Sequence, residues 1–373
     1  MKKIVILGGL GFIGLELSQH LVTAGHKVLI VDNLSPQIHG DLPVTIAPNG
    51  VSVVRLDIRD LSDRPDLIEG ADAVFHLAAE TGTGQSMYRI AHYVSVNELG
   101  TASLLEAIAK CERRPRQVIV ASSRSVYGEG AYVSTRAPEQ IIQPKPRARA
   151  QLDSGNWEPL DSDGIPLIAV ATPETLPFAP GSVYAATKAA QELLLASAST
   201  ALGFQCTVFR FQNVYGEGQS LQNPYTGIIS IFFNRARQGL EIPIYEDGLE
   251  SRDFVHVQDI VSALIDSLGT ELPNGAIMNL GSGRPTSVIE LAHELLDAAG
   301  VDIPLRVTGQ YRVGDIRHCY ADLQEAKRLI GFEPQVSLPQ GLRRFCAWAS
   351  KQPVYEDRLS QATEELRRKG LAN

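Results

Sequence analysis

The segment Ile4-Val5-Ile6-Leu7-Gly8-Gly9-Leu10-Gly11-Phe12-Ile13-Gly14 decides the fold class of this chain. Its four apolar residues predict a buried strand, and residues 12–24 have the apolar spacing of a helix that leads to a second strand at 28–31. Because glycines carry no side chain, the turn can bring backbone N–H groups and the positive end of the helix against a pyrophosphate. The last glycine lets the helix and the strand pack closely. This stretch predicts a dinucleotide-binding strand–helix–strand unit.

Asp32 ends the second strand, 18 residues beyond Gly14. At this place in a dinucleotide-binding unit, a carboxylate accepts hydrogen bonds from the hydroxyls of the adenosine ribose and repels a 2′-phosphate. The order of strand, glycines, helix and acid therefore predicts NAD, rather than NADP, as the cofactor.

The alternation of strands and helices continues as far as residue 211. Strands are predicted at 51–56, 73–77, 118–122 and 206–211, and helices at 97–110 and 184–201. Continuous apolar strands are typical of a parallel sheet covered on both faces. We therefore expect an α/β protein with a doubly wound parallel-sheet Rossmann domain and a smaller mixed α/β substrate-binding lobe. The expected boundaries are 1–216 and 217–373, with part of 252–283 returning to the Rossmann domain.

Residues 132–180 interrupt this alternation. They hold 8 of the 21 prolines and few apolar runs, which predicts a loop-rich insertion between a strand and the helix that begins near Tyr184. Near the end of the sequence, residues 356–369 are predicted to form a charged helix.

The composition excludes several classes of protein. The chain has 373 residues, 44% of them hydrophobic, and a net charge of −8, the wrong sign for a protein that neutralises nucleic-acid phosphates. The four cysteines are far apart and show no metal-ligand spacing, so no metal is expected. The first apolar run is too short for a signal peptide, and no run reaches 18 apolar residues. We expect a cytoplasmic protein that binds neither nucleic acid nor membrane.

Tyr184 and Lys188 lie four residues apart, on one face of the predicted helix. A cation beside a phenol lowers its pKa, so Tyr184 could take a proton from a sugar hydroxyl while hydride leaves the same carbon for a nicotinamide. The hydroxyl of Ser123, at a strand end, can complete such a site. Considered separately, the Tyr–Lys pair is equally compatible with an exposed helix surface, and the serine with a turn.

These motifs together give the chain a specific likeness. It resembles the extended short-chain dehydrogenase/reductase family in the glycine segment 8–14, Asp32-Asn33, Asp57-Ile58, His76-Leu77-Ala78-Ala79, Ser122-Ser123, Val126-Tyr127-Gly128, and Tyr184 with Lys188. The segments 210–216, 247–257 and 312–315 resemble the nucleotide-sugar epimerase/dehydratase branch of that family. His76, in its strand-end motif, is expected to be structural.

The resemblance implies a role for each matching residue. Catalysis would rest on Tyr184, Lys188 and Ser123. NAD would contact Gly8, Gly11, Phe12, Ile13, Gly14, Asp32, Asn33, Asp57, Ile58, Leu77, Ala78, Ala79, Asn97, Ser122, Tyr184 and Lys188. The nucleotide-diphosphate sugar would contact Thr81, Ser123, Asn213, Arg252, Arg312 and Asp315, with the arginines on its phosphates. Surface ion pairing of Arg252 and Arg312 with Asp253 and Asp315 is the alternative.

The likeness also bears on the reaction. Dehydratases of this family carry an Asp-Glu pair where this chain has Arg124 and Ser125, which disfavours elimination of water. Double-epimerising and reducing members use a Cys or His near the sugar ring, and no cysteine is close to Ser123 or Tyr184 in sequence. A 4-epimerase that oxidises C4 and returns the hydride to the opposite face is therefore favoured.

Segments 122–130, 182–188 and 213–227 are most similar to dTDP-L-rhamnose 4-epimerases, which make dTDP-6-deoxy-L-talose. A UDP-hexose 4-epimerase, an NADH-dependent 4-keto-sugar reductase and a non-catalytic NAD-binding protein stay open as alternatives. The resemblance further implies a homodimer that pairs through the helices at 97–110 and 184–201, although their leucines would serve equally well in a core.

Overall fold

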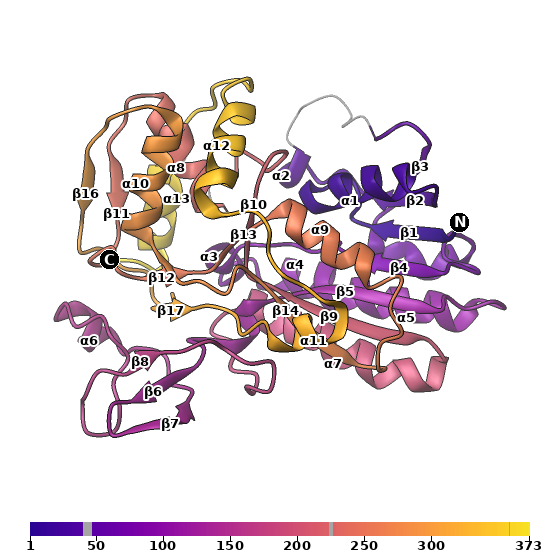
Figure 1. Ribbon diagram of the computed structural model, residues 1–373, viewed down its shortest axis with the longest axis horizontal. Helices are drawn as coiled ribbons and strands as arrows, with labels where there is room; N and C mark the ends of the chain where they lie inside the picture. Colours follow the sequence, from indigo (N-terminus) through magenta and orange to yellow (C-terminus); the bar gives the residue numbers. More distant parts are fainter. Residues whose placement is uncertain (40–46, 224–226, 358) are drawn as a thin grey trace.

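The computed structural model describes residues 1–39, 47–223, 227–357 and 359–373, and it is built around one large sheet (Figure 1). Seven parallel strands lie in the order β14-β9-β5-β4-β1-β2-β3. Their bounds are β1 (Lys3–Leu7), β2 (Lys27–Asp32), β3 (Val51–Arg55), β4 (Ala73–His76), β5 (Gln117–Ser123), β9 (Gln205–Phe211) and β14 (Ala276–Leu280). The predicted α/β class with a doubly wound parallel sheet is confirmed.

Helices cover both faces of this sheet because its strands are apolar on both sides. Successive side chains of a strand point in opposite directions. In β1, Ile4 and Ile6 pack with α1 (Phe12–Thr23) and α9 (Val257–Asp266), whereas Val5 and Leu7 pack with α5 (Gly100–Lys110) and α7 (Val183–Leu202). The short segments on the two sides of the sheet are α2 (Pro36–His39), η1 (Ile58–Asp63), η2 (Pro65–Leu67), α3 (Thr83–Ser86), α4 (Ile90–Tyr93), η3 (Val94–Leu99), η4 (Arg124–Tyr127) and α11 (Gln324–Ile330).

The chain beyond residue 211 forms a smaller mixed lobe with its own core, in which Phe233, Leu295 and Phe345 are buried. Its helices are α8 (Ile228–Arg237), α10 (Val288–Ala299), α12 (Leu338–Ala349) and α13 (Leu359–Arg368). Its strands are β10 (Asn213–Tyr215), β11 (Ile242–Ile244), β12 (Ser251–Arg252), β13 (Phe254–His256), β15 (Thr286–Ser287), β16 (Leu305–Val307) and β17 (His318–Cys319). Within this part of the sequence, α9 and β14 lie with the large sheet, where β14 pairs with β9.

The insertion at 132–180 is more ordered than its sequence predicts. It contains a three-stranded antiparallel sheet of β6 (Tyr132–Ser134), β7 (Ala137–Ile142) and β8 (Ile168–Ala169), together with α6 (Arg149–Asp153). Most of the insertion lies outside these elements, as the expectation of a loop-rich segment has it. Strand β7 has no signal in the sequence because it is largely exposed and includes a proline, so it has no apolar alternation. Figure 1 shows this small sheet apart from the large one, on the side of β17.

No helix within the described ranges is long and apolar enough to cross a membrane. The same ranges contain no group of three or more His, Cys, Asp or Glu residues placed to hold a metal ion.

Candidate active site

A cavity of about 630 Å³ lies at the carboxyl ends of the central strands and extends into the mixed lobe. This volume is within the range of ~300–1,000 Å³ that is usual for small-molecule sites. Every residue predicted to contact cofactor or substrate lines the cavity, with the exceptions of Asp57 and Asn97. The residues predicted from sequence therefore lie, with these two exceptions, around one continuous cavity.

The glycine turn has the close packing that a pyrophosphate cradle requires. Gly8 has a φ of 76°, and a Cβ there would lie 2.7 Å from the backbone of Ala78. A Cβ at Gly14 would lie 2.6 Å from Cα of Gly9. Gly11 is the N-cap of α1 and offers no side-chain cap, which leaves the first backbone N–H groups of the helix available to an anion. These features fit the diphosphate of NAD.

Asp32 lies beside this turn and lines the cavity. Its carboxylate accepts hydrogen bonds from the backbone N–H groups of Leu10 at 3.0 Å and Leu34 at 2.8 Å. Oδ1 lies 3.5 Å from Nε2 of His39. Burial by itself would raise the pKa of Asp32, but these hydrogen bonds outweigh it and lower the pKa overall. Asp32 is therefore a stable anion at the adenosine end of the cavity, where it suits two ribose hydroxyls and opposes a 2′-phosphate.

Two residues predicted to contact NAD have side chains that already form hydrogen bonds with other residues of the protein. The carboxylate of Asp57 accepts hydrogen bonds from Arg59 and from Nδ2 of Asn33, and the hydrogen bond from Arg59 holds its pKa well below the usual range. Asn97 is fully buried, and its amide bonds both backbone groups of Glu80, at 2.8 and 3.1 Å. The structure places Asn97 behind the cavity, where it fixes the backbone of the cavity-lining Glu80.

The catalytic candidates meet where β5 and α7 adjoin. Ser182 caps the N-terminus of α7 by accepting from the N–H of Ala185 at 3.2 Å, and this places Tyr184 in the first turn. The phenol of Tyr184 lies beside Ser123, at the carboxyl end of β5, and both residues line the cavity. Burial raises the pKa of Tyr184, whereas the polar interaction with Ser123 and the charge of Arg124 oppose that rise.

Lys188 makes its direct hydrogen bonds with other groups of the protein. Its Nζ donates to the carbonyl of Ala121 at 2.8 Å and to Oε1 of Gln191 at 2.9 Å. Burial lowers the pKa of Lys188 to about 7. Tyr184 and Lys188 both line the cavity, so the predicted action of Lys188 on the phenol stays a prediction, and Arg124 is a second cation that favours the phenolate.

A buried polar network supports these side chains from behind. Ser122 donates to Glu192, which forms an ion pair of 2.8 Å with Arg210. His76 is fully buried, and burial lowers its pKa to about 3, so its ring is neutral at physiological pH. Its Nε2 contacts Thr101 at 2.9 Å, which agrees with the expectation of a structural role.

Arg124 is a site residue that sequence reasoning missed. It was considered only as a position without a carboxylic acid, yet it lines the cavity and its Nε donates to Oδ1 of Asn213 at 2.8 Å. Burial and the nearby charge of Arg252 lower its pKa. The sequence signal that could have identified Arg124 as a site residue is its position directly after Ser123.

The two predicted phosphate ligands have different surroundings. Arg252 pairs with Asp315 at 3.0 Å and donates to the carbonyls of Ser251, Ile316 and Arg317, so its Nη atoms have protein partners. This ion pair involves a buried Arg252 and therefore differs from the alternative of surface pairing with neighbouring aspartates. Arg312 lies with its guanidinium 4.9 Å from the ring centroid of Tyr245, and its buried Nε has no hydrogen-bond partner. Both arginines line the cavity.

Comparisons with known proteins agree with this site. Residues 4–149 and 159–281 match the model of the NAD dependent epimerase/dehydratase family, which confirms the predicted family and cofactor. The chain is 38% identical over 355 residues to dTDP-L-rhamnose 4-epimerase of Burkholderia thailandensis, a match that covers 94% of this chain and 96% of that protein.

Solved structures show the same architecture. UDP-glucose 4-epimerase of Thermotoga maritima, solved with UDP-glucose, is similar with a TM-score of 0.76 and 28% identity over 94% of this chain and 99% of that one. MoeE5, solved with UDP-glucuronic acid and NAD, has a TM-score of 0.75 and 27% identity at the same coverage. On these matches and on its glycine turn, Asp32 and Tyr184, the chain belongs to the NAD dependent epimerase/dehydratase family.

Proposed function

We propose that this protein is a nucleotide-sugar 4-epimerase that interconverts dTDP-L-rhamnose and dTDP-6-deoxy-L-talose. The observation that carries the proposal is that Ser123, Tyr184 and Lys188 line one cavity together with the glycine turn and Asp32. The 38% identity to a protein of that name supports the choice of substrate.

The side chains of the site have complementary tasks. Bound NAD would supply the hydride acceptor at C4 and the hydride donor for the return step. Tyr184 takes the proton of the 4-hydroxyl as a general base and gives it back as an acid, and Ser123 hydrogen-bonds the same oxygen. Asn213, Arg252, Arg312 and Asp315 would hold the nucleoside diphosphate, with the arginines on its phosphates and Asp315 on a hydroxyl-bearing part. The sugar can then turn while the nucleotide stays anchored.

The surroundings of the sugar end favour epimerisation over elimination. Ser125 bonds Ser123 at 3.0 Å and Arg124 bonds Asn213, so neither position offers the acid that a dehydratase needs. Among the described residues that line the cavity there is no cysteine, and its histidine is His39, beside Asp32 at the adenosine end. Cys319 is buried behind the site, and burial raises its pKa. The sugar end of the site therefore lacks the Cys or His that double-epimerising members of the family use.

The decisive experiment is proton NMR of the purified protein with dTDP-L-rhamnose, and then with UDP-glucose and UDP-galactose, without added NAD. We expect a C4 epimer of dTDP-L-rhamnose at a fixed equilibrium ratio and no net NADH. Epimerisation of the UDP sugars in preference would reassign the substrate. Product that forms only when NADH is added to a 4-keto sugar would replace the proposal with a reductase, and no reaction at all would contradict it.

We also propose a role for each domain and an oligomeric state. Residues 1–216 would hold the cofactor and 217–373 the nucleotide sugar, with part of 252–283 belonging to the first unit. The protein would form a homodimer through α5 and α7, where Leu193 of α7 is 55% exposed and Leu99, directly before α5, is 54% exposed. Exposed leucines on adjacent helices suit burial against a second copy.

A further inference from the structure

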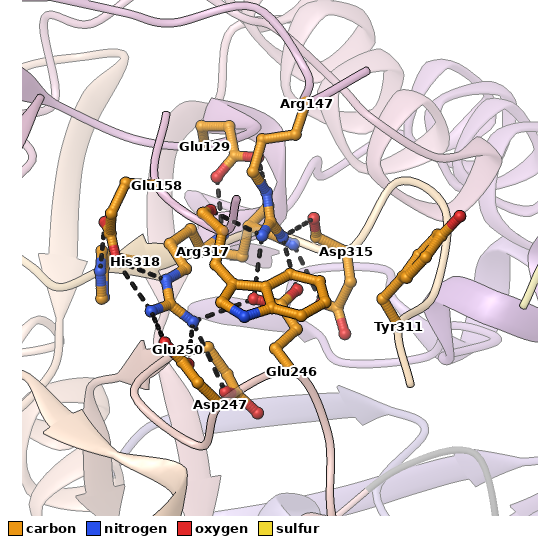
Figure 2. Close-up of polar contacts among 12 residues, drawn as sticks. Glu129, Arg147, Glu158, Glu246, Asp247, Glu250, Tyr311, Asp315, Arg317 and His318 are labelled. Atoms are coloured by element: carbon orange, nitrogen blue, oxygen red, sulfur yellow. Dashed lines mark hydrogen bonds and ion pairs between the residues drawn. The ribbon is translucent and has the colours of Figure 1, made fainter. Parts of the chain in front are cut away.

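The insertion at 132–180 sends two charged side chains toward the substrate end of the cavity. Arg147, between β7 and α6, has a side chain that is 1% exposed, and Glu158 follows α6. Neither residue lines the cavity, yet both contact segments that do (Figure 2).

Arg147 joins two walls of the cavity. Its Nη1 and Nη2 atoms each lie 2.9 Å from a carboxylate oxygen of Glu246, and Nη2 also donates to the carbonyl of Asp315 at 2.9 Å. Within the insertion, Nη1 donates to the carbonyl of Trp157 at 2.9 Å. Glu246 and Asp315 both line the cavity, so this one guanidinium fixes the distance between them.

Glu158 makes the corresponding contact with a second buried arginine. Its Oε1 lies 2.7 Å from Nη2 of Arg317, and its Oε2 lies 3.2 Å from Nε2 of His318. Arg317, 1% exposed in its side chain, also reaches Glu246 at 3.0 Å and Asp247 at 2.7 Å. The insertion thus supplies both a cation and an anion to the same cluster.

The cluster depends on the positive charge of Arg147 because carboxylates outnumber arginines in it. Glu129, Glu246 and Glu250 are all buried around Arg147 and Arg317. Burial raises the pKa of Glu129, and the charge of Arg147 opposes that rise. Glu246 adopts a φ of 47°, a left-handed conformation that residues other than glycine seldom adopt. Without Arg147, Glu129 would lose its paired guanidinium, Glu246 would keep only Arg317, and this turn would lose part of its support.

Residues 315–317, which Arg147 contacts at Asp315, bond directly to Arg252, a residue predicted to bind the substrate. Asp315, whose carbonyl Arg147 holds, accepts through Oδ1 from Nη2 of Arg252 at 3.0 Å. The next two carbonyls, of Ile316 and Arg317, accept from Arg252 at 2.8 and 3.0 Å. The position of Arg252 in the cavity therefore follows the position of residues 315–317.

We propose that the insertion braces the diphosphate-binding wall of the cavity, with Arg147 as the positioning residue. The substrate class in this proposal rests on the proposed function, whereas the bracing of residues 245–252 and 311–318 does not.

The test compares full-length Arg147→Met and Arg147→Lys with the control Arg136→Met, whose guanidinium pairs with Asp163 in an exposed part of the same insertion. The readouts are dTDP and UDP affinity by calorimetry, KM and kcat for epimerisation, NAD content, and hydrogen exchange of residues 245–252 and 311–318. For Arg147→Met we expect diphosphate affinity to fall and KM to rise about tenfold, with faster exchange in both segments and unchanged kcat and NAD content. Arg147→Lys should recover part of the affinity, and Arg136→Met should behave as wild type.

A folded Arg147→Met protein with wild-type affinity and exchange would overturn the proposal. If that variant does not fold, Glu158→Gln takes its place, because the Glu158 side chain is 34% exposed. We expect its diphosphate affinity to fall and its KM to rise about threefold. Unchanged affinity and exchange in Glu158→Gln would contradict the bracing role. If the wild type binds neither nucleotide and turns over no sugar, the proposed function fails. The exchange of the two segments then decides the bracing role alone.

Discussion

At the scale of single residues, the chemistry depends on the environment of one phenol. Burial raises the pKa of Tyr184, and the polar interaction with Ser123 and the charge of Arg124 act against that rise. A general base must lose its own proton before it can take one from a substrate. Ser123 and Arg124 therefore oppose the effect of burial, although the pKa of Tyr184 stays above its ordinary value.

Replacing Tyr184 by Phe removes the hydroxyl and keeps the ring. We expect Tyr184→Phe to lower kcat by roughly 10²–10⁴-fold, the usual contribution of a general acid–base group. The glycine turn and Asp32 are untouched, so NAD content should equal that of the wild type. NMR of the sugar and absorbance of the released cofactor measure the two quantities, and retained turnover would refute the assignment.

Replacing Arg124 by Met removes the positive charge that favours the phenolate. The pKa of Tyr184 should rise, so the limb of the kcat/KM profile that increases with pH should move to higher pH. Arg124→Lys keeps the charge and should leave that limb near its wild-type position. Rates measured between pH 5 and 10 test this. An unshifted limb in Arg124→Met would show that this charge does not set the base.

Some residue roles could be inferred from sequence because the backbone dictates them. Gly8 and Gly14 leave no room for a Cβ, and Asp32 follows the second strand of any such unit. Asp57 and Asn97 show the opposite case, since their polar groups have found partners inside the protein. Which partner a polar side chain takes depends on segments distant in sequence, so a motif alone does not reveal it.

At the scale of elements, the site depends on how α7 is fixed to the sheet. Glu192 of α7 pairs with Arg210 of β9, and both side chains are at most 4% exposed. Arg210→Met leaves Glu192 as an unpaired buried charge, a loss of about 3–5 kcal/mol in the free energy of unfolding. Urea unfolding followed by circular dichroism measures it.

The matched control is Arg306→Met, which removes an exposed pair with Glu241. Its effect should stay within about 0.5 kcal/mol, as is usual at the surface. Equal stability of the two variants would mean that the buried pair does not hold α7 in place.

The helices and strands differ in how well the sequence predicts them. The inner strands β1, β4 and β5 are buried on both faces and therefore read as apolar runs, which predicted them closely. Strand β7 is mostly exposed and carries no such signal. The contact of Arg147 with Glu246 joins residues 99 positions apart, which no local pattern can predict.

At the scale of the whole molecule, the cavity is shared between the sheet and the mixed lobe. The sheet contributes the glycine turn, Ser123 and Tyr184, and the mixed lobe contributes Arg252 and Arg312. Residues 132–180 line none of it but hold the mixed-lobe wall through Arg147. A cofactor and a substrate can therefore meet only where these three parts keep their relative positions.

The proposed homodimer makes a prediction about the outer face of α7. A symmetric pair would bring Leu193 of both copies into one interface, so Leu193→Glu would bury two charges without partners. We expect this variant to be a monomer by light scattering coupled to gel filtration, whereas the wild type is a dimer. Leu249→Glu changes a leucine of similar exposure, 54%, on the mixed lobe and should leave the mass unchanged. A monomeric wild type, or a Leu193→Glu protein that stays dimeric, would contradict pairing through this face.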